Sequence, residues 1–350
     1  MAMTRIDAWS GLQADTYQHH FLHEHDCLWP EKNCYTDVWI ELIHTLGCDP
    51  IAMFSFVHTA DFEGDQWTFF KPVHAELRQL YGIDVQELTV WRPLLEHAQE
   101  YLSVGKFICC EVDSFYLPDT AGTNYRRQHA KTTILMASLD IPSRRLGYFH
   151  NAGYFDLSGD DFSHLFRMTD APDASYLTPY AEFVRIDQLI RQTPSELAER
   201  SFEFFQNHFN NRPLTNPFTR FRQRLLRDRD ELQLSSLAHY HAWAFASIRQ
   251  AGAAFELAAA HLRWLADWGH PALVDAAVCF DSISVASKTL ILKGARSVNA
   301  GKPLEAAELL TTMEHNWESG MAVIQQSRTP ASAVARIFKT GKQALTVVPH

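Results

Sequence analysis

A cysteine stands where the first long helix is expected to begin. Cys34 comes one turn before an apolar helical stripe that ends at Gly47, and it follows Asn33, a residue type that favours helix starts. A helix N-terminus carries about half a positive charge, which lowers the pKa of a nearby thiol and favours the thiolate. The pattern therefore allows two interpretations, a reactive thiol or a small buried cysteine at a helix start.

A cysteine nucleophile needs a histidine that takes its proton and an Asn or Asp that orients the ring. His129 lies just before a predicted strand, and Asn151 lies near the end of the next predicted strand. Adjacent antiparallel strands can place a group of the second beside an imidazole at the start of the first. His150 and Asp156 are close enough in sequence to compete with Asn151. The alternatives are a histidine in a surface loop and an Asn in a turn.

The chain just before His129 carries residues that could hold a substrate. Asp113 interrupts an apolar strand, and its carboxylate could bind an amine or cap the loop turn. Tyr116 and Tyr125 lie on the approach to His129. Arg126 and the arginine after it could bind a phosphate, such as that of a phosphopantetheine arm, through forked donors. Solvated loop charges are the alternative for these two arginines.

A metal site is the main rival interpretation, because histidines cluster near the N-terminus. The cluster comprises His19, His20, His23 and His25. Neutral imidazoles bind zinc, but the segment lacks HExxH and its spacing matches no known ligand pattern. The acidic loop at Asp61, Glu63 and Asp65 has neither the length nor the ligand order of an EF-hand. We therefore expect no metal and no cofactor.

Composition sets wider limits on the class of protein. The chain has 350 residues, 46% of them hydrophobic and 21% charged, which is typical of a soluble globular protein with two domains. Its net charge of −10 disfavours nucleic acid as the main partner. No apolar run is long enough for a membrane span, and the start has no apolar h-region, so we expect no signal peptide. We expect a cytoplasmic protein whose six cysteines are reduced.

The chain changes its pattern near residue 190. Before that point, short strand-like and helical segments alternate. Strands are predicted over 51–57, 107–117, 132–140 and 145–157. A helix is predicted in the run 37–47, which stops at Gly47, and further helices over 73–81 and 92–104. From Pro194 onward, apolar stripes at helical spacing are separated by Gly, Pro or Asn breaks. This predicts an α+β domain over 1–190, followed by an all-α helical bundle over 191–350.

Four segments of the first half together resemble a bacterial family of unknown function, DUF1839. The resemblance covers most of residues 28–166, and the segments are NCYTDVWIELIHTLG, DFEGDQWTFFK, EVDSFYLPDTAGTNYRRQHAKTTI and LGYFHNAGYFDLSGDDF. More distantly, the layout is similar to the N-terminal domain of the butirosin biosynthesis protein BtrH and to papain-like C39 peptidases. In those proteins a Cys opens the first helix, a His starts a strand, and an Asp or Asn follows on the next strand.

This resemblance implies a papain-like fold for the first domain, with Cys34 as nucleophile, His129 as base and Asn151 as the residue that orients His129. BtrH-like proteins move an acyl or aminoacyl group from a carrier-protein thioester to a small-molecule amine. C39 peptidases have a Gln shortly before the Cys that helps to form the oxyanion hole. The segment before Cys34 has no Gln, so Asn33 or backbone N–H groups would supply the donors.

The leading functional hypothesis is therefore thiol-dependent acyl transfer through Cys34. A cysteine amidase or peptidase would use the same residues and differ only in its acceptor. The alternative from another class is a papain-like binding protein without catalytic activity.

Overall fold

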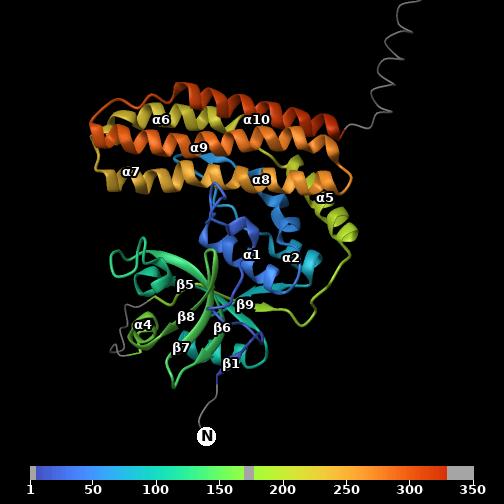
Figure 1. Ribbon diagram of the computed structural model, residues 1–350, viewed down its shortest axis with the longest axis vertical. Helices are drawn as coiled ribbons and strands as arrows, with labels where there is room; N and C mark the ends of the chain where they lie inside the picture. The colour runs from blue at the N-terminus through green and yellow to red at the C-terminus, as the bar shows by residue number, and fades with distance from the viewer. Residues whose placement is uncertain (1–4, 169–176, 329–350) are drawn as a thin grey trace, which may run out of the picture. The chain divides into compact units, whose positions relative to one another are not determined.

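The computed structural model describes residues 5–168 and 177–328, and its contacts divide the chain into two compact units. Unit 1 comprises residues 1–59 and 69–211, and unit 2 comprises residues 60–68 and 212–350. The predicted mixed α+β class with a helical C-terminal region is confirmed (Figure 1). The contact-based division assigns residues 194–210 to unit 1, whereas the sequence suggested a boundary at residue 190.

Unit 1 is built on a twisted antiparallel sheet in the order β4-β9-β5-β6-β7-β8, with β1 also paired to β6. The strands are β1 (Ile6–Asp7), β4 (Asp84–Glu87), β5 (Phe107–Asp113), β6 (Lys131–Asp140), β7 (Arg145–His150), β8 (Gly153–Ser158) and β9 (Ala181–Arg185). Its helices are α1 (Cys34–Thr45), α2 (His74–Tyr81), α3 (Leu94–Leu102), α4 (Gly159–Leu165) and α5 (Pro194–Asn210). Short 3₁₀ segments cover Phe21–His23, Pro50–Thr59, Ser114–Tyr116 and Pro118–Thr120.

The strand predicted over 51–57 is wrong, because this segment lies within the 3₁₀ helix Pro50–Thr59. Almost the whole run is buried, so it is apolar on every side. A continuous apolar run has no period that separates a buried strand from a buried helix. The two predicted strands on either side of the 141–143 turn pair as β6 and β7, as expected, but 145–157 divides into β7 and β8 at a second turn.

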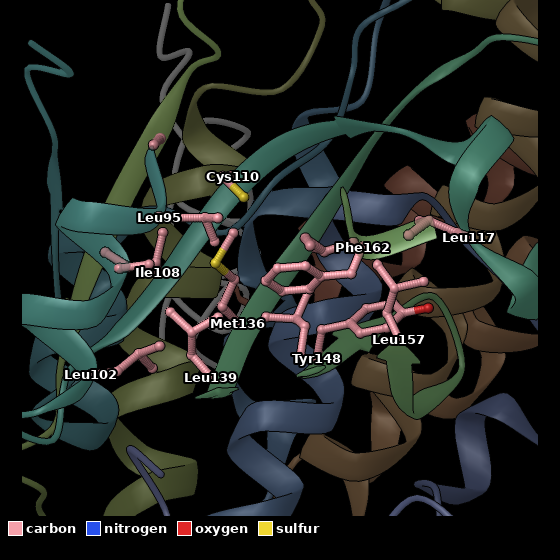
Figure 2. Packing of buried hydrophobic residues seen from close by; sticks show 14 of the residues in the cluster. Leu95, Leu102, Ile108, Cys110, Leu117, Met136, Leu139, Tyr148, Leu157 and Phe162 are labelled. Carbon is pink, nitrogen blue, oxygen red and sulfur yellow. The ribbon is translucent and has the colours of Figure 1, made fainter. Parts of the chain in front are cut away.

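The two faces of the sheet carry different chemistry because successive strand residues point to opposite faces. Figure 2 shows the apolar core on one face, where Ile108 of β5 and Met136 of β6 pack with Leu95 of α3. Tyr148 and Phe162 extend the same core toward α4. The alternate residues of β5 and β6 therefore face the other side, where α1 packs against β6, β7 and β8.

Unit 2 is helical, with a short hairpin from the first half of the chain. It contains α6 (Pro217–Leu234), α7 (Leu237–Ala244), a π-helical segment (Phe245–Arg249), α8 (Gln250–Asp267), α9 (Val274–Ala300) and α10 (Ala307–Ser327). The hairpin consists of β2 (Phe62–Glu63) and β3 (Gln66–Trp67). The Trp67 ring lies 4.7 Å from Phe218 and 6.2 Å from Phe255, between centroids, so this segment completes the helical core. None of the described helices is long and apolar enough to cross a membrane.

Candidate functional site

Cys34 is the first residue of α1, as the sequence predicted. Asn33 caps the helix, because its side-chain oxygen accepts a hydrogen bond from the Thr36 N–H at 2.8 Å. The Asn33 amide nitrogen donates to the Phe70 carbonyl at 2.9 Å. Both ends of the buried Asn33 amide are thus engaged within the protein, and they anchor the start of α1.

The Cys34 thiol lies over strand β6. It is partly exposed, and its Sγ is 3.8 Å from Oγ1 of Thr133, the closest hydrogen-bonding partner that the structure gives it. Thr133 alternates along β6 with Ile134, which packs in the apolar core, so Cys34 and the core of Figure 2 occupy opposite faces of the sheet. By contrast, Cys110 is fully buried in that core, and burial raises the pKa of its thiol.

His129 is held by Asp113 and not by Asn151. The His129 Nδ1 lies 2.6 Å from Oδ2 of Asp113, and the ring stacks on Phe115 with centroids 4.2 Å apart. Asp113 also caps the turn that follows β5, because its Oδ1 accepts from the Phe115 N–H at 3.0 Å. The His129 side chain is 65% exposed, and its Nε2 has no hydrogen-bond partner among the described residues.

The structure does not join Cys34, His129 and Asn151 by hydrogen bonds, within the residues that it describes. His129 precedes Thr133 by four residues, which is about 13 Å of extended chain. Lys131 lies between them in sequence and donates to Glu111 at 2.6 Å. Asn151 occupies the turn between β7 and β8 with a left-handed φ of 44°, a conformation that Asn tolerates better than most residues.

The substrate-binding candidates of the loop lie together near His129. The Tyr125 hydroxyl donates to Asp161 at 2.9 Å, and the Arg126 guanidinium pairs with the same carboxylate. The Arg126 guanidinium also lies 5.9 Å from the ring centroid of Tyr116 and 5.5 Å from that of Tyr125. Arg126 is still 44% exposed, so this aromatic and cationic cluster remains accessible to a ligand.

A buried polar network lies on the face of the sheet that carries the apolar core, opposite Cys34, and the sequence did not predict it. The Thr132 hydroxyl lies 2.7 Å from Nε2 of His150, and the His150 Nδ1 lies 2.5 Å from Oδ2 of Asp119. The Tyr148 hydroxyl donates to the other oxygen of Asp119. His150, a competitor for the orienting role, is therefore engaged with Asp119. Asp119 lies 31 residues before His150, so no local pattern in the sequence predicts the pair.

The N-terminal histidine cluster contributes a buried ion-pair network. His23 contacts Glu41 through Nδ1 and Asp37 through Nε2, the latter at 3.2 Å. Burial disfavours the imidazolium, but hydrogen bonds and charges from Asp37 and Glu41 outweigh this cost and raise the pKa of His23 to about 9. Among residues 5–168 and 177–328, no group of three or more His, Cys, Asp or Glu side chains is arranged to hold a metal ion.

These features define a two-part α+β protein with a cysteine at the N-terminus of a helix that packs on an antiparallel sheet. The family model of the DUF1839 N-terminal domain matches residues 18–186, and that of the DUF1839 C-terminal domain matches residues 194–326. The chain therefore belongs to the DUF1839 family. A search of curated proteins gives no match.

Proposed function

We propose that this protein is a thiol-dependent acyl or aminoacyl transferase with a papain-like N-terminal domain. In this proposal, Cys34 takes the acyl group from a carrier-protein thioester and passes it to a small-molecule amine. The observation that carries the proposal is the placement of a partly exposed thiol at the first residue of an Asn33-capped helix, on the face of the sheet opposite the apolar core.

The first step is an exchange of one thioester for another. The Cys34 thiolate attacks the thioester carbonyl, and the phosphopantetheine thiolate leaves with the former C–S bond electrons. The attacking and the leaving group are both thiolates, so this step does not demand a strong acid for the leaving group. The positive end of the α1 dipole lies at Cys34, and the Thr133 hydroxyl can rotate to donate a hydrogen bond to its sulfur.

His129 is the proposed base for Cys34, with Asp113 instead of Asn151 as the residue that holds the ring. The Nδ1 contact with Asp113 leaves Nε2 available for a proton, as in hydrolase triads. Reaching Cys34 would require the loop that carries His129 to close when a substrate binds. Arg126 is the proposed contact for the phosphate of the carrier arm, because its guanidinium is exposed beside Tyr116 and Tyr125.

The test is to incubate the full chain with a panel of aminoacyl carrier proteins and to search by intact mass for an acyl adduct. We expect an adduct that disappears in Cys34→Ala and persists in Cys279→Ala, which removes another partly exposed thiol. Water in place of the amine would give a cysteine amidase or peptidase with the same residues. Release of free acid from the thioester without any amide product would show that water is the acceptor.

A second candidate function is ligand binding without catalysis. One observation favours it, because Thr133 occupies the place beside Cys34 where the papain-like resemblance implies an imidazole. The rate of alkylation of Cys34 against pH separates the two functions. A thiol that titrates near the free value of about 8.5 supports a binding protein. A depressed pKa supports the transferase, and His129→Ala should then slow the acylation of Cys34 by the carrier thioester, because the loop closes only on a substrate.

A further inference from the structure

A second cluster of titratable side chains lies at the same end of α1. Tyr35 follows Cys34, and its hydroxyl donates to Oε2 of Glu182 at 2.8 Å. The same hydroxyl oxygen lies 2.7 Å from Nε2 of His74, the first residue of α2. The Tyr180 hydroxyl donates to Oε1 of Glu182 at 2.7 Å. The Glu182 side chain is 1% exposed, so groups of the protein supply its hydrogen bonds.

Counting protons fixes the direction of these hydrogen bonds. A carboxylate only accepts, so the single hydroxyl proton of Tyr35 is directed to Glu182. The Tyr35 oxygen must then accept a proton from His74, which places a hydrogen on Nε2. In neutral imidazole the other nitrogen carries a lone pair. The Nδ1 of His74 is therefore a free acceptor, with no hydrogen-bond partner among the described residues.

The surroundings keep this acceptor unprotonated at neutral pH and within reach of a ligand. The His74 side chain is 33% exposed. Burial is the main cause that lowers the pKa of His74, and Lys71 lowers it further, while Glu182 opposes both. His74 is thus neutral at pH 7. If it takes a proton, the buried Glu182 carboxylate lies 3.6 Å from its Nε2 and stabilises the imidazolium.

This cluster and the Cys34 thiol flank the same part of the sheet. Cys34 and Tyr35 are consecutive residues in the first turn of α1. Cys109 on β5 pairs with Glu182 on β9 in the ladder, and both Glu182 and Cys34 contribute to the raised pKa of the Cys109 thiol, after burial. The three elements α1, β5 and β9 therefore bring the thiol and the cluster to one region.

We propose that His74, held by Tyr35 and Glu182, is the general base that deprotonates the amine acceptor when it attacks the acyl group on Cys34. This inference rests on the transferase function proposed above. The amine nitrogen forms the new C–N bond, its proton moves to His74 Nδ1, and the C–S bond to Cys34 breaks. The Cys34 thiolate leaves, and the proton on His74 then returns to it or to solvent. The acceptor class is an amine that carries an N–H proton for transfer to His74.

The experiment follows the two half-reactions separately in the full chain. An acyl thioester of N-acetylcysteamine loads Cys34, and glycinamide then serves as the amine, with both steps followed by intact mass. We expect His74→Gln to acylate at the normal rate and to lose about 100-fold in the rate of amide formation. The rate of amide formation in the unaltered protein should fall at acid pH as His74 becomes protonated, and this limb should vanish in His74→Gln.

Two tyrosine variants supply a matched control. Tyr35→Phe and Tyr180→Phe each remove one hydroxyl from Glu182, but only Tyr35 joins Glu182 to His74. We expect a far larger loss of amide formation from Tyr35→Phe. Equal losses would mean that both tyrosines merely support Glu182. This result would overturn the proposal that Tyr35 links Glu182 to His74.

Failure of the proposed transferase function and failure of the proposed role of His74 give different results. If Cys34 is never acylated, the transferase function fails and the role of His74 fails with it. If Cys34 is acylated and His74→Gln forms amide normally, only the inference about His74 is overturned. NMR of ¹⁵N-labelled protein tests the geometry without any substrate, because His74 should carry its hydrogen on Nε2. A hydrogen on Nδ1 would contradict the proton count.

Discussion

The raised pKa of the buried His23 imidazole predicts how the free energy of unfolding changes with pH. Its side chain has no exposure and lies between Asp37 and Glu41, with Lys32 and Tyr17 also bonded within this network. The pKa of His23 is about 9 in the folded protein, against an ordinary value of 6.5. Because the folded value is the higher one, protonation of His23 stabilises the fold.

The sign and size of the effect follow from linkage. The stabilisation is fully present below about pH 6.5 and is lost as the pH rises through about 9. A difference of about 2.5 pKa units corresponds to about 3 kcal/mol of unfolding free energy at about 1.4 kcal/mol per unit. No discount for solvent screening applies, because both ion-pair partners are as buried as His23.

Urea unfolding at pH 6, 8 and 10, followed by circular dichroism, measures this loss. His23→Gln should be less stable at pH 6 and should lose less stability than the unaltered chain on going to pH 10, where the buried Cys109 and Cys110 thiols add a loss common to both. His25→Gln is the matched control, because His25 lies two residues away and is exposed, so its pH dependence should equal that of the unaltered chain. If His23→Gln does not fold, an NMR titration of His23 in the unaltered protein serves instead. A His23 that titrates near 6.5, or stability that is flat from pH 7 to 10, would refute the reasoning.

Substitutions of Trp67 and Asp119, each with a control, test the core of unit 2 and a buried hydrogen-bond network. Trp67→Ala should destabilise unit 2 by about 4 kcal/mol in chemical unfolding, because it removes a buried indole from the helical core, whereas the exposed Phe69→Ala should cost little. Asp119→Ala should cost about 3 kcal/mol, since it leaves the buried Tyr148 hydroxyl and His150 Nδ1 without their acceptor. Asp119→Asn should recover part of that loss in the same assay, and failure to do so would argue against the hydrogen bonds as the cause.

Several elements could be read from the sequence because their signals are local. The capping box of Thr193 and Glu196 forms as its spacing predicts, and α5 begins there. The helix that starts at Cys34 was predictable for the same reason, since Asn33 and the apolar stripe act within two turns of chain. The 50–59 segment was misread because burial on all sides erases the period that separates a helix from a strand.

The candidate site likewise contains features set by neighbouring residues and features set by contacts between distant parts of the chain. The sequence by itself determined that Cys34 opens a helix, because capping and periodicity act between neighbours. Only the tertiary structure decided that Thr133 faces the thiol, that Asp113 holds His129 and that Glu182 reaches Tyr35 across 147 residues of sequence. These partners are set by strand register and by which face each side chain occupies. A shift of register by one residue would reverse every one of those faces, and no short stretch of sequence carries that information.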